Sequence, residues 1–121
     1  MSSRETAFGA DDWRRLLRTF GENPERQGLV ETPERVAKAW AHWTRGYQED
    51  PAAILKVFDD GGEHYNELIV VRNIPVYSHC EHHLAPFFGY AAVGYLPTGR
   101  IVGLSKLTRL VNCFAARLQV Q

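Results

Sequence analysis

The chain has 121 residues, of which 45% are hydrophobic and 23% charged, a composition that suits one soluble globular domain. Its 14 basic and 14 acidic side chains give a formal net charge of zero, so no overall field draws it to nucleic acid or to a membrane. The sequence contains neither the apolar core of a signal peptide nor an apolar run long enough to cross a bilayer. We therefore expect a cytoplasmic protein with no nucleic-acid or membrane partner, in which any anion-binding surface is local.

The first part of the chain predicts helices. An Asp-Asp pair at 11–12 precedes an amphipathic segment, so we expect a short helix with an acidic N-cap that Gly21 closes. Thr-Pro at 32–33 predicts a second helix, with threonine as the N-cap, that ends near Gly46. Residues 51–56 predict one more helical turn. The second helix should turn these apolar side chains toward a core: Val36, Ala37, Trp40 and Trp43.

The pattern then changes from helical to β-type. Asp-Asp-Gly-Gly at 59–62 predicts a turn, and the segments 68–71, 76–77 and 87–95 are rich in β-branched and aromatic residues. Pro-Thr-Gly at 97–99 predicts a hairpin turn into a short strand that follows it. We expect two or three antiparallel strands in this region.

The last segment predicts a helix with Ser105 as its N-cap. The order of elements, helices followed by strands and a final helix, defines an α+β fold. A small sheet covered by one helix leaves open edges, so we expect either extensive oligomerisation or a larger protein. The apolar residues that recur at helical spacing in this last segment are Leu107, Leu110, Val111, Phe114, Ala115 and Leu118.

The candidate metal site lies in Ser-His-Cys-Glu-His-His at 78–83. Cys80 and His83 are spaced so that one turn can present both to a zinc ion, and the neighbouring His79 and His82 strengthen this reading. The alternative is a polar loop whose side chains are satisfied without metal. Zinc would keep the cysteine as thiolate and make hydroxide available near neutral pH.

Two groups lie between the candidate ligands. Glu81 and His82 would project differently from Cys80 and His83, so they could transfer protons or orient the ligands. For Glu81, a solvated surface carboxylate is an equally good interpretation.

The start of the last helix is a candidate anion site. Ser105 and Lys106 open it, and Arg109 follows four residues after the serine on the same side. The alternative is a serine N-cap with two exposed cations. Cys113 lies beside two arginines off the apolar stripe, and we interpret it as incidental.

Several motifs together resemble one known family. They are Thr-Pro-Glu-Arg-Val-Ala at 32–37, Cys-Glu-His-His-Leu-Ala-Pro-Phe-Phe-Gly at 80–89, Gly-Tyr-Leu-Pro at 94–97, Gly-Leu-Ser-Lys-Leu at 103–107 and Arg-Leu-Gln-Val-Gln at 117–121. In order and spacing they resemble GTP cyclohydrolase I, from about residue 14 to the last residue.

The resemblance implies a tunnelling fold, in which strand pairs flank two helices and subunits close into a toroidal homo-oligomer. It implies a zinc-dependent hydrolase that opens the imidazole ring of GTP, releases formate and forms 7,8-dihydroneopterin triphosphate for folate or other pterin synthesis.

Site roles follow from the resemblance motif by motif. Cys80 and His83 would be the zinc ligands, His82 the acid/base, and Glu81 part of the same loop. Gln121 would lie at the guanine end of the pocket. The triphosphate would be held by Arg35, Ser105, Lys106 and Arg109.

The resemblance also suggests how the chain is divided. Residues 1–62 would form an N-terminal helical region and residues 63–121 the first half of the catalytic domain. The family's guanine-binding glutamate, a further zinc-ligating cysteine and a second catalytic histidine would follow residue 121. We therefore expect these residues alone not to turn over GTP.

Two other functions remain open. One is a related purine or pterin enzyme such as a nitrile reductase, against which the adjacent histidines and the Ser-Lys pair argue. The other is a non-catalytic metal-binding or subunit-interaction module.

Overall fold

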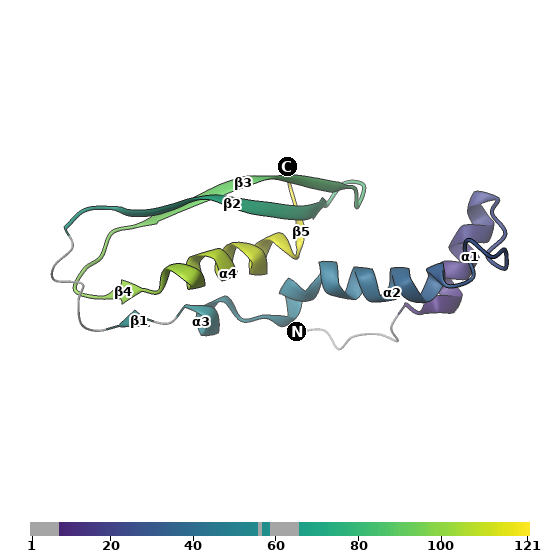
Figure 1. The fold of residues 1–121 in the computed structure, drawn as a ribbon, viewed down its shortest axis with the longest axis horizontal. Coiled ribbons are helices and arrows are strands. Elements are labelled where there is room, and N and C mark those ends of the chain that lie inside the picture. Colours follow the sequence, from purple (N-terminus) through teal and green to yellow (C-terminus); the bar gives the residue numbers. More distant parts are fainter. Residues whose placement is uncertain (1–7, 56, 59–65) are drawn as a thin grey trace. The chain divides into compact units, whose positions relative to one another are not determined.

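The computed structural model describes residues 8–55, 57–58 and 66–121. It divides into two compact units, one ending at His42 and the other beginning at Trp43. The predicted α+β class is confirmed, because helices come first in the chain and a small sheet with a further helix follows (Figure 1). The predicted boundary at 62/63 lies outside the described residues. Every helix in the described part is too short or too polar to cross a bilayer.

The first helix, α1, spans Ala10–Phe20 and is capped differently from the prediction. Its N-cap is Gly9, and the aspartates lie in the first turn instead. The carboxylate of Asp12 accepts a hydrogen bond from the Gly9 amide at 2.9 Å, which satisfies a donor that the helix itself leaves free. Gly21 ends the helix with a φ of 98°, as expected for a left-handed C-cap.

The second helix, α2, spans Thr32–Trp43. It begins one residue earlier than predicted, because the carbonyl of Glu31 already accepts the helical hydrogen bond from the Arg35 amide at 3.2 Å. Thr32 is therefore the first helical residue and not the cap.

The tryptophans of α2 have different environments. Trp40 stacks on Trp13 of α1, with ring centroids 6.4 Å apart, so within the N-terminal unit it packs as expected. Trp43 is 43% exposed, and its ring lies 4.9 Å from that of His79. The prediction of a buried Trp43 was wrong, because this residue covers a histidine at the surface of the C-terminal unit.

The C-terminal unit begins with two short helical elements. A 3-10 turn, η1, spans Arg45–Gln48 where α2 was expected to end, and a single turn, α3, spans Pro51–Ile54. Asp50 caps α3 by accepting a hydrogen bond from the Ala52 amide at 3.0 Å. The helical turn predicted for 51–56 is thus present, although residue 56 and the turn predicted at 59–62 lie outside the described residues.

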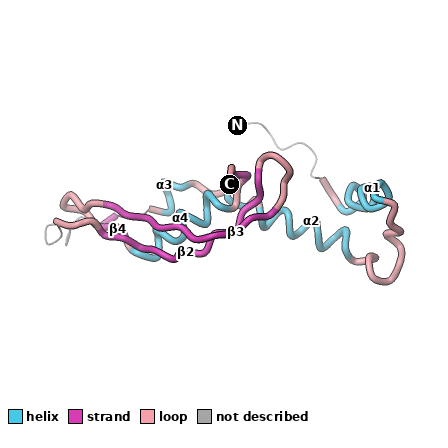
Figure 2. Tube along the Cα trace, turned by 90° about the horizontal axis from the view of Figure 1, so that it is seen from above, coloured by secondary structure: helices cyan, strands magenta, loops and turns pink. Residues whose placement is uncertain are grey.

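The main sheet has the strand order β3-β2-β5. Strand β2, Ile69–Cys80, pairs antiparallel with β3, Pro86–Tyr95, and parallel with the short β5, Leu118–Gln119. The sheet is therefore mixed, whereas only antiparallel strands were expected. Figure 2 shows β2 and β3 running side by side along their length.

The two β segments predicted at 68–71 and 76–77 belong to one strand. Its register with β3 shifts between Val71 and Ile74, and Asn73 adopts a φ of 60° within the bulge. An extra residue in one strand produces such a shift and increases the local twist.

A second, two-stranded sheet replaces the predicted hairpin. Strand β4, Ile101–Val102, pairs antiparallel with β1, Val57–Phe58, and not with β3. The hydroxyl of Tyr95 nevertheless ties β4 to the end of β3, because it accepts a hydrogen bond from the Val102 amide at 3.0 Å and contacts the same residue's carbonyl at 3.3 Å.

The last helix, α4, spans Leu104–Ala115 and lies along one face of the main sheet (Figure 1). Its N-cap is Gly103, so Ser105 is the second helical residue and makes no capping hydrogen bond with its side chain. Leu118, expected on the helical stripe, belongs to β5. The most buried side chains of α4 are those of Leu107 and Cys113. Cys113 is therefore a core residue, contrary to its interpretation as incidental.

The two faces of the β2–β3 pair differ in environment because strand side chains alternate between faces. Ile74 and Ser78 are buried beneath α4. The opposite face exposes a row of aromatic side chains, in which Tyr77 lies opposite Phe88 in the ladder. The exposed fractions are 74% for Tyr77, 81% for Phe88 and 78% for Tyr90.

Candidate functional site

The Cys-x-x-His sequence forms a tight turn between β2 and β3. The amide of Cys80 donates to the carbonyl of Ala85 at 2.8 Å, and the amide of Leu84 donates to the carbonyl of Cys80 at 3.0 Å. Leu84 adopts a φ of 56°, a left-handed conformation that lets the chain reverse within four residues. We call residues 80–85 the cysteine turn.

The turn surrounds the sulfur of Cys80 with backbone amides. The His83 amide donates to the Cys80 Sγ at 3.3 Å, and Cys80 is only 1% exposed. This hydrogen bond is the main cause that lowers the pKa of the thiol; burial opposes it, and the amides of Ala85, His82 and Cys80 itself add to the lowering. A thiol held in this way is prepared to act as thiolate, the form that binds metal.

The other side chains of the cysteine turn point into solvent. Glu81, His82 and His83 are exposed, and the two imidazole rings lie 6.4 Å apart. Exposure leaves these groups free to meet a substrate or a metal. His79 differs from them, since it precedes the turn in β2 and packs its ring against Trp43.

The described residues do not form a complete metal site. No group of three His, Cys, Asp or Glu side chains within them is arranged to hold an ion. Cys80 and His83 have the donor types that zinc prefers, and a catalytic zinc site uses three protein ligands. The cysteine turn therefore offers two donors of the types that zinc prefers, one fewer than the three protein ligands of a catalytic site.

Strand β5 brings the C-terminal glutamines beside the cysteine turn. Gln119 is in register with Cys80, and the amide of Glu81 donates to the carbonyl of Gln119 at 2.9 Å. The side-chain amide of Gln119 turns back to donate to the carbonyl of Phe114 at 2.7 Å. Gln121, the residue predicted for guanine, lies two residues beyond the end of β5 and is exposed.

The predicted phosphate residues lie at the other end of α4. Ser105 and Lys106 are in its first turn, whereas β5 and the cysteine turn lie beyond its last (Figure 1). A 12-residue helix is roughly 18 Å long at 1.5 Å per residue. Within one chain, the structure therefore does not bring Ser105 and Lys106 close to the cysteine turn.

Arg109 lies one turn further along α4 and faces a polar hollow. This hollow has a volume of about 410 Å³ and contains charges of both signs. It is lined by Arg45, Glu49, Asp50, Ala53, Ile54, Arg109 and Asn112.

Arg35 belongs to the N-terminal unit. It lies in α2, where its guanidinium forms an exposed ion pair with Glu31 at 2.6 Å. An exposed i,i+4 pair stabilises a helix by only a few tenths of a kcal/mol, about 0.3–0.5, so Arg35 could exchange this partner for a phosphate at little cost.

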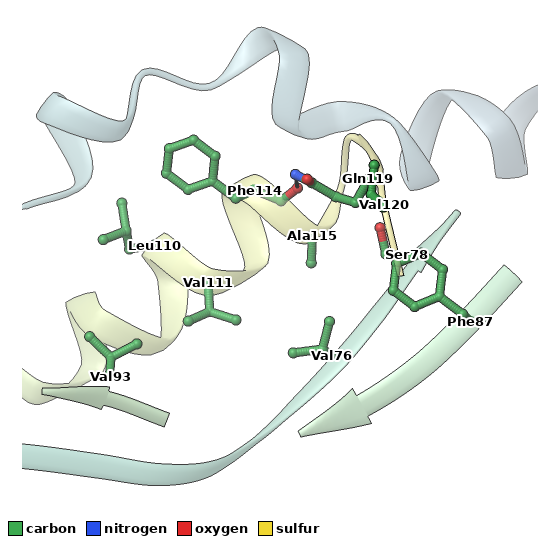
Figure 3. A pocket seen from close by; sticks show the side chains of 10 residues that line it. All are labelled: Val76, Ser78, Phe87, Val93, Leu110, Val111, Phe114, Ala115, Gln119 and Val120. Atoms are coloured by element: carbon green, nitrogen blue, oxygen red, sulfur yellow. Dashed lines mark hydrogen bonds between the residues drawn. The ribbon is translucent and has the colours of Figure 1, made fainter. Parts of the chain in front are cut away.

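An apolar pocket in the C-terminal unit lacks the charged side chains that a triphosphate would need. It has a volume of about 450 Å³ and lies between the main sheet and α4 (Figure 3). No Lys, Arg or His is among the described residues that line it, so it offers no charge to a triphosphate. Its lining residues are Val76, Ser78, Phe87, Val93, Leu110, Val111, Phe114, Ala115, Gln119 and Val120.

Sequence reasoning missed the residues that hold β5 in place. Arg117 contacts η1 through its side chain, and its carbonyl accepts a hydrogen bond from the Ser78 hydroxyl at 3.1 Å. The Leu118 amide donates to the hydroxyl of Tyr47 at 2.9 Å. In the sequence, Arg117 and Leu118 belong to the Arg-Leu-Gln-Val-Gln segment, of which only Gln121 was predicted to have a role in the site.

The structure thus shows an α+β protein with a Cys-x-x-His turn at one end of its main sheet and a separate cationic helix start. A family model described as GTP cyclohydrolase I matches residues 10–121. The chain belongs to the GTP cyclohydrolase I family, as the motif resemblance predicted.

Individual relatives agree with this assignment. The chain is 78% identical over 121 residues to "GTP cyclohydrolase 1" of Nitrosospira multiformis, covering 100% of this chain and 63% of the relative. It is 75% identical over 114 residues to the protein of that name from Janthinobacterium sp., covering 94% and 58%. The Drosophila melanogaster protein of that name is 51% identical over 114 residues, covering 93% and 34%. The chain thus spans less than two thirds of the length of these relatives.

Proposed function

We propose that this chain is a segment of a GTP cyclohydrolase I that opens GTP to formate and 7,8-dihydroneopterin triphosphate for folate or other pterin synthesis. The observation that carries the proposal is the pairing of β5 with the end of β2. It brings the glutamine segment to the end of the sheet at which the cysteine turn holds a thiol, two exposed imidazoles and a carboxylate.

In this proposal Cys80 and His83 are two zinc ligands, and a third comes from residues outside those the structure describes. The pre-formed turn and the lowered thiol pKa support the assignment, since the ligand is the deprotonated sulfur. Zinc, when bound, would supply Lewis acidity for the hydrolysis.

The exposed side chains of the cysteine turn would carry the protons. His82 lies next to the proposed ligand His83 and points to solvent, and an imidazole can both accept and donate a proton, which suits proton transfer to a purine ring nitrogen. Glu81 would assist from the same turn. Gln121 would bind the guanine edge through its amide, which can donate and accept.

The triphosphate would be bound by Ser105, Lys106 and Arg109 together with Arg35. Ser105 and Lys106 lie in the first turn of α4, a helix length from the cysteine turn, and this separation supports a site completed by a second subunit. Among the described residues β3 is an edge strand of the main sheet, and the aromatic row is exposed. Both offer hydrogen-bonding or apolar surface to a neighbouring subunit, which further supports a homo-oligomer.

Formate release from GTP tests the proposal in the full-length enzyme that contains this segment. We expect release by the parent, a loss of at least about 100-fold in His82→Ala, and activity close to the parent in His42→Ala. A parent that binds zinc but releases no formate would favour the alternative, a non-catalytic metal-binding or subunit-interaction module. The absence of a third donor among the described residues is the observation that keeps this alternative open.

A further inference from the structure

Arg117 lies between the end of α4 and the start of β5, at the point where the chain turns toward the cysteine turn. Its guanidinium donates to two backbone carbonyls, from Nε to Gly46 at 3.1 Å and from Nη2 to Glu49 at 3.3 Å. Nη2 also lies 3.5 Å from the buried Sγ of Cys113. One side chain therefore joins η1 to the end of α4.

The charge of Arg117 is held without a carboxylate. Within the described residues it forms no ion pair, and its guanidinium lies 4.8 Å from the ring centroid of Phe114 and 5.9 Å from that of Tyr47. Carbonyl dipoles and aromatic faces stabilise a planar cation in this geometry. The planar guanidinium is required for these two hydrogen bonds, because each carbonyl accepts from a different nitrogen of the group.

The contact with η1 is close and specific. The Gly46 amide donates to the carbonyl of Ala116 at 3.0 Å, and a β-carbon at Gly46 would lie 2.0 Å from the carbonyl oxygen of Cys113. Only glycine allows this approach. Tyr47, the next residue, accepts the Leu118 amide through its hydroxyl.

The same segment is fixed to β2 on its other side. The Ser78 hydroxyl donates to the Arg117 carbonyl, Leu118 is in register with His79, and the Glu81 amide donates to Gln119. A two-residue strand is too short to hold its own register. The fixed end of α4 therefore sets where β5 meets the cysteine turn.

We propose that Arg117 is a positioning residue, which locks β5 against η1 and thereby holds the backbone of the cysteine turn and the segment leading to Gln121. This inference deepens the proposed function, because the turn and Gln121 belong to the proposed active site. Arg117 itself contacts neither.

Amide hydrogen exchange tests the proposal without relying on catalysis. In the full-length enzyme, Arg117→Ala should speed exchange at the Glu81 and Leu118 amides by about tenfold relative to the amides of the β2–β3 ladder. Arg117→Lys keeps the charge but loses the fork, so it should restore part of the protection. Tyr47→Phe, which removes a single hydroxyl, should affect Leu118 more than Glu81. The exposed Arg15→Ala is the control and should change neither.

Two results would overturn the proposal. One is unchanged exchange at Glu81 and Leu118 in Arg117→Ala. The other is an equal increase at these amides and throughout the β2–β3 ladder, which would mean that Arg117 only contributes to general stability. If Arg117→Ala does not fold, Arg117→Lys and Tyr47→Phe decide between the same outcomes.

Formate release distinguishes this inference from the function on which it rests. If the parent is inactive but Arg117→Ala still speeds exchange at the Glu81 and Leu118 amides, the proposed function is rejected and the positioning role of Arg117 is retained. If the parent is active and Arg117→Ala keeps both its activity and the protection of the Glu81 and Leu118 amides, only the positioning role of Arg117 is rejected.

Discussion

The amide of Glu81 donates to the carbonyl of Gln119 at 2.9 Å, across 38 residues of sequence. This bond joins the cysteine turn to the strand that follows α4. Together with the adjacent register of His79 with Leu118, it makes β5 the third strand of the main sheet. The end of the sheet that carries the proposed chemistry is therefore built from two segments that are far apart in the sequence, the cysteine turn and β5.

Replacing Cys80 should remove zinc. In the full-length enzyme we expect Cys80→Ala to lose most of its bound zinc, because the thiolate is the strongest of the proposed ligands. Metal analysis of the purified protein provides the measurement. Cys113→Ala is the matched control, since this second thiol is also buried but lies in the core beneath η1. Equal zinc in Cys80→Ala and the parent would contradict the assignment.

Removing the cations of α4 should weaken the binding of phosphate. We expect Lys106→Ala and Arg109→Ala each to reduce the affinity for GTP by about 1.5–3 kcal/mol, and to leave guanosine much less affected, because each change removes a charge-assisted hydrogen bond. Isothermal titration with both ligands checks this. Arg72→Ala, an exposed cation on the β2 bulge, should behave like the parent. If both α4 variants bind GTP as tightly as the parent, the helix start is not the triphosphate site.

Gly46→Ala should destabilise the C-terminal unit. The added methyl would lie 2.0 Å from the Cys113 carbonyl oxygen and 2.8 Å from that of Ala116, both of them backbone atoms that cannot move aside easily. A cost of about 1–3 kcal/mol in the free energy of unfolding is expected. Urea denaturation measures it. Gly89→Ala is the control, because nothing lies within 4 Å of a β-carbon at that position. Similar midpoints for the two variants would show that η1 does not pack as described.

Leu107→Ala should destabilise the chain far more than Leu104→Ala. Leu107 is 4% exposed beneath the sheet, and its truncation should cost about 2–5 kcal/mol through lost burial and the cavity left behind. Leu104, three residues earlier in the same helix, is 57% exposed and should cost less than about 1 kcal/mol. Comparing the two thermal unfolding midpoints tests which face of α4 is buried.

Local chemistry explains why much of the fold could be predicted. Hydrophobic periodicity identified α1, α2, α4 and the long strands β2 and β3, and Gly21 marked the end of α1 as its left-handed φ requires. Helix starts were displaced by a residue or two, because Gly9 and Gly103 cap helices where a polar side chain was expected. The prediction of a hairpin after β3 was wrong for a different reason, because β4 pairs with β1, more than 40 residues earlier in the chain.

By itself, the sequence determined the family, and it predicted the residues of the candidate site. The Cys-x-x-His spacing places a thiol and imidazoles on one turn, and such short-range patterns are set by local backbone geometry. Only the tertiary structure decided that Arg117 and Tyr47 fix β5, that Cys113 is buried, and that Ser105 lies a helix length away from Cys80. Such contacts join residues far apart in the sequence, so they depend on how whole elements pack, which no local pattern records.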